Sequence, residues 1–258
     1  MVIRRIRQHV ATHNWFAVAV DVVIVVIGVF LGTQANNWNE SRLERAAAAD
    51  YRQQIIKDLA SNEADMASRS AYYGEARKHA LAALNRLDSA SGPRGEQFLI
   101  DSFQASQVWL RPLVRNGYDE MVGAGLSHGI GDERLRSRLA AYYTQIRQFD
   151  VTALSSTQYR EKLRRALPYR IQAAIQRQCG DRIKTRSDGE QEASLPDQCE
   201  LGLDTATVAA GESRLAAAGL EQDLTRLIVD IDQKVSGFNR FGHNAHGLRI
   251  ELEAAARR

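Results

Sequence analysis

An apolar run near the N-terminus of the chain predicts a membrane-spanning helix. From Phe16 to Leu31 the sequence reads FAVAVDVVIVVIGVFL, with Asp21 as its only charged residue. With its flanks the run covers about 20 residues, enough to cross a hydrocarbon core of about 30 Å in a helix that rises roughly 1.5 Å per residue. Trp15 and Trp38 bracket the run, as aromatic anchors at the two headgroup levels would. We therefore assign residues 16–35 to a transmembrane helix.

Beyond the span, apolar residues recur at steps of three and four, which is the spacing of a helix rather than of a strand. A first stripe leads from Tyr51 to Leu87 with no proline before Asp88, so the span and the first body helix can be one continuous helix. The last stripe, from Leu220 to Leu252, follows a coiled-coil-like pattern and predicts the clearest helix of all. Further helices are expected over residues 96–108, 118–124 and 132–167, and around Ile171 and Ile175.

Residues that start or stop helices separate these segments. The stretch 89–95 contains Gly92, Pro93 and Gly95 and marks the first break, Asp132 is placed to cap the helix that follows it, and Pro168 should end or kink that helix. No alternation of useful strand length is present. The sequence therefore predicts an all-α fold in which an N-terminal transmembrane helix is followed by an extracytoplasmic bundle of long amphipathic helices, residues 36–258.

The charge distribution predicts the orientation in the membrane. The net charge is +3, from 34 basic and 31 acidic residues. Arg4, Arg5 and Arg7 lie in an acid-free tail, residues 1–15, so the rest of the chain balances at 31 against 31. By the positive-inside rule, the basic tail is cytoplasmic and the body is periplasmic, in a bacterial inner membrane. A neutral body also argues against a nucleic-acid partner.

A cleaved signal peptide is the alternative interpretation of the same segment. An arginine-rich start, an apolar core and Thr33-x-Ala35 loosely fit such a peptide. Asp21 inside the core and the long polar stretch before it favour an uncleaved, single-pass signal anchor.

Asp21, Gly28 and Gly32 share one face of the predicted span. At about 100° per residue they fall within about 20° of one another, and Gly28 and Gly32 form a GxxxG motif that lets two helix backbones approach closely. An acid in a membrane usually faces protein or water. The stripe therefore predicts a helix–helix contact, with a second copy or with a partner membrane protein. The alternative is that glycine is merely common in spans and that Asp21 reaches water.

The span runs into a polar signature made of Gln34, Asn36, Asn37, Trp38, Asn39 and Glu40. This resembles the Q-x-N-N-W-N-E signature of a family of uncharacterised bacterial single-span membrane proteins, and the stretch from Tyr118 to Tyr143 is similar to that family's middle region. The resemblance covers about a quarter of the chain. It implies a membrane-anchored helical protein and brings no reaction with it. The amides can stabilise a helix that leaves the membrane or bond across an oligomer, and we favour the first role.

Cys179 and Cys199 are the two cysteines of the chain, and they bracket a polar loop, residues 180–198. In a periplasmic body a disulfide between them is chemically allowed, and the inferred compartment favours it over two free thiols. A zinc site is not expected, because no neighbouring histidine or cysteine completes a ligand set.

The remaining candidates for chemistry are better explained by packing. His243 and His246 are three residues apart in the last helix, but two ligands are not a metal site, and His128 lies in a glycine-rich turn. In the pairs Tyr72–Tyr73 and Tyr142–Tyr143, one ring is expected in the core and the other at its boundary. Phosphate-binding, dinucleotide-binding, nucleophile-elbow and zinc-protease motifs are absent from the sequence. We therefore expect no catalytic residue, no cofactor and no metal.

These features lead to three functional hypotheses. The first is a non-enzymatic membrane-anchored periplasmic scaffold or interaction protein that associates through its transmembrane helix, as a homo-oligomer or with a partner membrane protein. The second is a periplasmic sensor that binds a small ligand between bundle helices and signals through a partner in the membrane. The third, which the sequence favours least, is a membrane-tethered enzyme.

Overall fold

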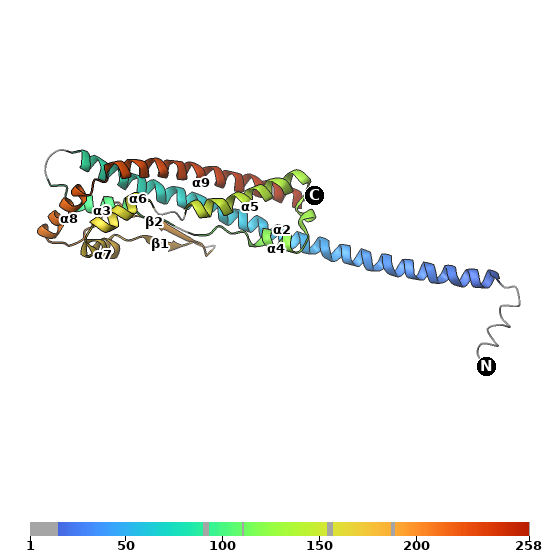
Figure 1. The fold of residues 1–258 in the computed structure, drawn as a ribbon. Coiled ribbons are helices and arrows are strands. Elements are labelled where there is room, and N and C mark those ends of the chain that lie inside the picture. The colour runs from blue at the N-terminus through green and yellow to red at the C-terminus, as the bar shows by residue number, and fades with distance from the viewer. Residues whose placement is uncertain (1–14, 90–92, 110, 154–156, 187–188, 258) are drawn as a thin grey trace. The chain divides into compact units, whose positions relative to one another are not determined.

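The computed structural model describes residues 15–257 except 90–92, 110, 154–156 and 187–188 (Figure 1). The predicted tail, with Arg4, Arg5 and Arg7, lies outside the described residues. The chain divides into two compact units, Met1–Asp50 and Tyr51–Arg258.

Helix α2 (Trp15–Asp88) contains the apolar run and continues without a break into the first body stripe. It holds no proline, and its end at Asp88 is where the sequence pattern predicts it. Over residues 19–46 its apolar side chains are exposed, as Val25 and Phe30 show at 64% and 58%. From Ala19 onward, α2 is long and apolar enough to cross a membrane.

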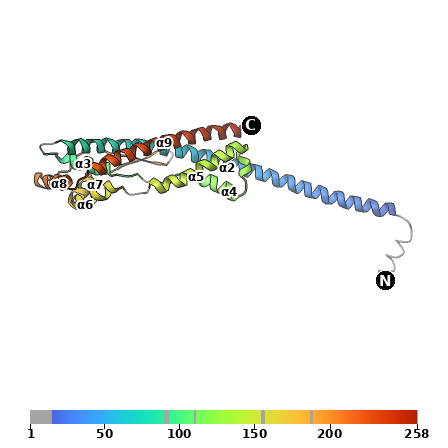
Figure 2. The same cartoon turned by 45° about the horizontal axis from the view of Figure 1, so that its top comes forward.

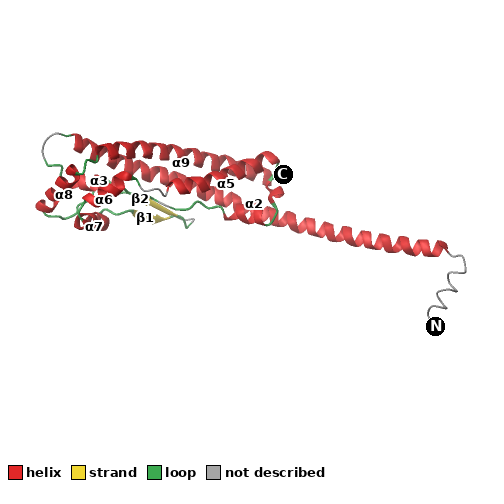
Figure 3. Ribbon diagram, in the orientation of Figure 1, coloured by secondary structure: helices red, strands yellow, loops and turns green. Residues whose placement is uncertain are grey.

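The second unit is helical apart from one short hairpin in its described part (Figure 3). The all-α prediction is therefore confirmed. After α2 come, in order, α3 (Glu96–Ala105), α4 (Asn116–Gly123), the 3-10 helix η1 (Ser127–Ile130), α5 (Glu133–Ala153), α6 (Gln158–Ala166), α7 (Tyr169–Gln178), β1 (Arg182–Thr185), β2 (Gln191–Ser194), α8 (Thr205–Ala217) and α9 (Glu221–Ala256).

Helix α9 runs antiparallel to the body part of α2, and the two lie side by side in Figures 1 and 2. Three polar pairs cross between them at intervals of seven residues. Glu63 Oε1 is 2.8 Å from His246 Nδ1, Ser70 donates to Asn239 at 2.9 Å, and Arg77 bonds Asp232 at 2.5 Å. A seven-residue spacing on both helices keeps one seam in contact over several turns. Between the polar pairs the Tyr73 and Phe238 rings pack 5.4 Å apart.

The predicted apolar stripes supply the core between the helices. On α9 every member of the predicted stripe is buried except Val235, which is half-buried. The largest side chains of the core come from α2, α3, α5 and α6 as well as α9: Ile55, Leu59, Met66, Tyr72, Phe98, Phe103, Tyr142, Tyr143, Tyr159 and Phe238.

The helix boundaries in the middle of the chain follow specific capping residues. Asp132 caps α5, because its Oδ1 accepts the backbone N–H of Leu135 at 2.8 Å. Pro168 separates α6 from α7, as expected. The prediction of one helix over 132–167 was wrong, since α5 ends at Ala153 and α6 begins at Gln158. Thr157 caps this new start by accepting the Arg160 N–H at 3.2 Å.

Two elements were not anticipated from the sequence. The polar loop 180–198 contains the antiparallel hairpin β1–β2, with Ile183 opposite Ala193 and Thr185 opposite Gln191. Helix α8 follows the loop, and Asp204 caps it by accepting the Thr207 N–H at 2.8 Å. Helices α8 and α7 approach closely at Gly211, where a Cβ atom would lie 2.6 Å from Ile171 Cδ1. A larger residue at Gly211 would require the Ile171 side chain to shift, so Gly211 suits the close packing of α8 on α7.

Candidate functional site

The body part of α2 carries a row of buried polar side chains along the face that meets residues 94–117. This segment runs back along α2 in the opposite direction, first as α3 and then as an extended stretch. Asp58, Asn62, Asp65, Arg69 and His79 are all at most 9% exposed, although aspartate, asparagine and arginine are normally found at the surface. Because buried polar groups need partners, their bonds identify what the row does.

Two residues of the row bond to the backbone at the end of the extended stretch and the start of α4. Asn62 makes a reciprocal pair with Val114, donating from Nδ2 to the carbonyl at 2.7 Å and accepting the N–H at Oδ1 at 2.8 Å. Asp58 accepts the Gly117 N–H at 2.8 Å and the Gln54 amide at 2.9 Å. The Asn62 pair takes the place of a strand partner for Val114, and Asp58 satisfies a backbone N–H in the first turn of α4. Burial raises the pKa of Asp58, which the two hydrogen bonds partly oppose.

Asp65 and Arg69 form a buried ion pair one turn further along. Arg69 Nε lies 2.7 Å from Asp65 Oδ2, and the guanidinium side chain is 1% exposed. Arg69 also donates to the carbonyl of Arg111 in the extended stretch. Burial raises the pKa of Asp65, and the charge of Arg69 opposes that rise. A charge this deep is tolerated only with its partner in place, so the pair makes the fold dependent on both residues.

The extended stretch in turn connects α2 to the hairpin. Arg111 forms an ion pair with Glu190 and donates to the Gln191 carbonyl at 2.8 Å. Ser61 of α2 donates to the other oxygen of Glu190 at 3.1 Å. The hairpin is therefore fastened to the bundle at the start of β2.

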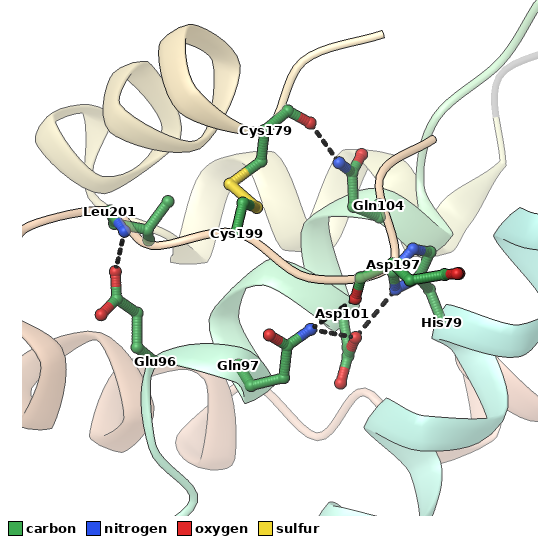
Figure 4. Close-up of a disulfide and its surroundings, with 9 residues drawn as sticks. All are labelled: His79, Glu96, Gln97, Asp101, Gln104, Cys179, Asp197, Cys199 and Leu201. Carbon is green, nitrogen blue, oxygen red and sulfur yellow. Dashed lines mark hydrogen bonds and ion pairs between the residues drawn. A yellow bond between two sulfur atoms is a disulfide. The ribbon is translucent and has the colours of Figure 1, made fainter. Parts of the chain in front are cut away.

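A second polar group lies beside the disulfide (Figure 4). His79 Nδ1 of α2 is 2.8 Å from Asp101 Oδ1 of α3, and both side chains are 4% exposed. Arg86 and Gln97 also bond to Asp101, Gln97 at 2.9 Å. Arg86 of α2 balances the charge of the buried carboxylate, and the bonds of His79 and Arg86 to Asp101 join α2 to α3.

The His79–Asp101 pair has the two side-chain types that activate a nucleophile in a catalytic triad. An aspartate that holds a histidine through Nδ1 orients Nε2 for proton transfer when a hydroxyl or thiol stands beside it. The buried Nε2 of His79 has no hydrogen-bond partner in the described part of the chain, so no nucleophile stands there. Among the described residues no group of three or more His, Cys, Asp or Glu could hold a metal ion. The buried dyad therefore fits a structural role.

The disulfide joins Cys179, at the end of α7, to Cys199, with their Cα atoms 5.8 Å apart. Gln104 of α3 donates to the Cys179 carbonyl, and Glu96 accepts the Leu201 N–H (Figure 4). The bond closes the loop that contains β1 and β2, and α3 contacts the chain on both sides of it.

The tyrosine pairs are placed differently from the prediction. We expected one ring of each pair at the core boundary, but Tyr72, Tyr73, Tyr142 and Tyr143 are all at most 2% exposed. The rings within each pair meet edge to face, with centroids 5.6 Å and 5.2 Å apart. Burial raises the pKa of all four phenols. In each pair, neighbouring elements pack over both rings, although adjacent residues of a helix point in different directions.

Two hollows at the surface were considered for a small ligand. One, of about 220 Å³, lies between α6 and α9 and is lined by Tyr159, Asp223, Arg226 and Asp230 among others. The other, of about 440 Å³, lies between α5 and α9 beside the Arg138–Glu251 ion pair. Ligand sites are mainly apolar and commonly about 300–1,000 Å³. The first hollow is too small and both are lined largely by charged side chains, so neither favours a sensor.

The residues singled out in the sequence fall into separate places. Asp21, Gly28 and Gly32 are exposed on α2 in the first unit, and so is the whole polar signature from Gln34 to Glu40. Arg42, which follows the signature, lies 5.9 Å from the centroid of the Trp38 ring and donates to Asn39 at 3.4 Å, so these contacts of the signature are local. His243 and His128 are exposed, and His246 bonds to Glu63. The buried row on α2 was missed, apart from Asn62, because its members looked like polar interruptions of an apolar stripe.

Comparison of the chain with protein-family models, with curated proteins and with solved structures found no match.

Proposed function

We propose that the protein is a membrane-anchored scaffold or interaction protein that associates through its transmembrane helix. The observation that carries the proposal is helix α2, which contains both the apolar run and the buried row of the body. The resemblance of residues 34–40 to the single-span family supports the same proposal. The orientation follows from the charges, with the N-terminus cytoplasmic and the body periplasmic.

The span offers a specific face for association. Gly28 and Gly32 leave room for a second backbone, since a Cβ atom at either position would meet no atom within 4 Å in the single chain. Asp21 shares this face and is costly to expose to lipid. A second helix packed here would cover the acid and use the close approach that glycine allows. The partner is a second copy of the chain or another membrane protein.

Replacing both Gly28 and Gly32 with isoleucine is expected to abolish most of the self-association of the span, because the added side chains keep the backbones apart. A bacterial two-hybrid assay on residues 1–40 measures this. The matched control is the substitution of Val23 and Val26 by isoleucine, which enlarges the opposite face of the span and should leave association unchanged. Equal signals from the glycine variant and the wild type would contradict a homotypic contact.

A further inference from the structure

The two edges of the β1–β2 hairpin differ in how their backbone groups are used. The outer edge of β2 is closed by side chains, because Arg111 donates to the Gln191 carbonyl at 2.8 Å and Glu75 accepts the Leu195 N–H at 2.6 Å. The Gln191 carbonyl and the Leu195 N–H belong to the backbone groups that point away from β1. The bundle therefore covers the edge of the hairpin formed by β2, and the edge formed by β1 is the free one.

The register defines which groups of β1 face outward. Arg186 donates its N–H to the Glu190 carbonyl at 2.7 Å, and the pairing continues with Lys184 opposite Glu192 and Arg182 opposite Ser194. In an antiparallel pair, hydrogen-bonded residues alternate with residues whose N–H and C=O point away. Ile183 and Thr185 are the residues that point away. No hydrogen bond from the described part of the chain reaches these backbone groups.

The exposed strand is held in place at both of its ends. At its base, Tyr72 donates to Asp181 at 3.1 Å and the disulfide closes the loop. At the other end, Glu190 is held by Ser61 and Arg111. All four residues of β1 are exposed, and the apolar side chain of Ile183 is 55% exposed. A rigid edge of this kind can receive a strand without first being ordered.

The charges of β1 indicate what it would receive. Arg182 and Lys184 project from one face of the strand, where Ser194 lies across from Arg182 and Glu192 across from Lys184 in the register. Ile183 and Thr185 project from the other face. A strand added to this edge would place acidic residues beside the two cations and an apolar residue beside Ile183.

We propose that the free edge of β1 is a docking site for an extended segment of another protein, in which acidic and apolar residues alternate. A second copy of this chain fits the edge less well. If two β1 strands paired antiparallel about Ile183, Arg182 would face Lys184, and if they paired about Lys184, two lysines would face each other. Like charges directly opposite destabilise a strand pair. The cations thus disfavour self-pairing and favour an acidic partner.

The docking edge extends the proposed function but does not depend on contacts of the span. It would give the body its own partner, separate from any partner in the membrane. A variant with Gly28 and Gly32 replaced by isoleucine should therefore bind the acidic segment as the wild type does. Loss of span association with retained peptide binding, or the reverse, separates the two proposals.

The test uses the full chain in detergent and two fluorescent peptides. One alternates glutamate with valine over seven residues, and the other has lysine in place of glutamate. Fluorescence anisotropy should show saturable binding of the glutamate peptide and none of the lysine peptide. Equal binding of both, or binding of neither, would overturn the proposal.

Thr185→Pro tests the edge itself. The Thr185 N–H points away from β2, so proline removes an outward donor and leaves the hairpin ladder intact. We expect affinity for the glutamate peptide to fall about tenfold. This is the effect of losing one hydrogen bond, together with steric hindrance from the proline ring. Thr185→Val is the matched control and should bind as the wild type does. Far-UV circular dichroism and an intact disulfide check that the proline variant is folded.

Charge reversal tests the chemistry of the partner. The double variant Arg182→Glu, Lys184→Glu should lose the glutamate peptide and gain the lysine peptide. Unchanged peptide preference would contradict an acidic partner. If light scattering shows a wild-type dimer that Thr185→Pro converts to monomer, the edge pairs with a second copy, and the proposal of an acidic partner fails.

Discussion

Replacing Arg69 with methionine is expected to lower the free energy of unfolding of the body by about 3–5 kcal/mol. Methionine fills much of the space of the arginine side chain but leaves the Asp65 carboxylate buried without its partner. It also removes the donor to the Arg111 carbonyl. Urea unfolding of the detergent-solubilised chain, followed by far-UV circular dichroism, measures the loss.

The matched control is Arg77→Met, two turns further along the same helix. Arg77 pairs with Asp232 on α9, but the two side chains are 41% and 49% exposed. Exposed pairs of this kind contribute about 0–1 kcal/mol. Adding Asp65→Leu to Arg69→Met should recover much of the loss, because it removes the orphaned charge. Equal destabilisation by Arg69→Met and Arg77→Met would contradict a special role of the buried pair.

Removing the disulfide is expected to produce the second-largest loss. The bond spans 20 residues, for which the loss of chain entropy in the unfolded state amounts to about 3 kcal/mol. The double variant Cys179→Ser, Cys199→Ser should therefore unfold at lower urea than the oxidised wild type.

The reduced wild type is the control for the serine substitutions themselves. It should unfold where the double serine variant does, since both have an open loop. Limited proteolysis should then cut first between residues 180 and 198, because the loop is no longer closed at its base. A double variant as stable as the oxidised wild type would show that the loop is held by its other bonds alone, namely those of Glu190 and Asp181.

Much of the fold could be predicted from the sequence because local signals coincide with its boundaries. The end of α2 at Asp88, the Asp132 cap and the break at Pro168 each depend on a residue whose effect is local. The apolar stripe of α9 has the period of a helix, and its members are buried. The helix ends and the apolar stripe can therefore be predicted without knowing which other elements pack against them.

The buried row on α2 depends on contacts distant in sequence and so could not be predicted. Asp65 and Arg69 have the composition of a solvated helix face, and only the position of Arg111 shows that they are buried. The hairpin was missed because β1 has four residues, all exposed, and an apolar alternation cannot be recognised over that length. Both tyrosine pairs are fully buried because third elements cover the second ring, as Tyr118 covers Tyr143 at 4.4 Å.

The contact at Asp21, Gly28 and Gly32 remains a prediction, because it concerns a second helix. The polar signature after the span likewise makes only local contacts within the chain. Both belong to the first unit, in which the helix is long and apolar enough to cross a membrane.

The central claim is that one N-terminal helix anchors a body that lies outside the cytoplasm. A fusion of alkaline phosphatase to the C-terminus after residue 258 tests this most directly, because the enzyme is active only where its disulfides form. We expect an active fusion that sediments with membranes and resists carbonate extraction. An inactive fusion would contradict the orientation, and an active fusion released in soluble form would show that the N-terminal segment is cleaved.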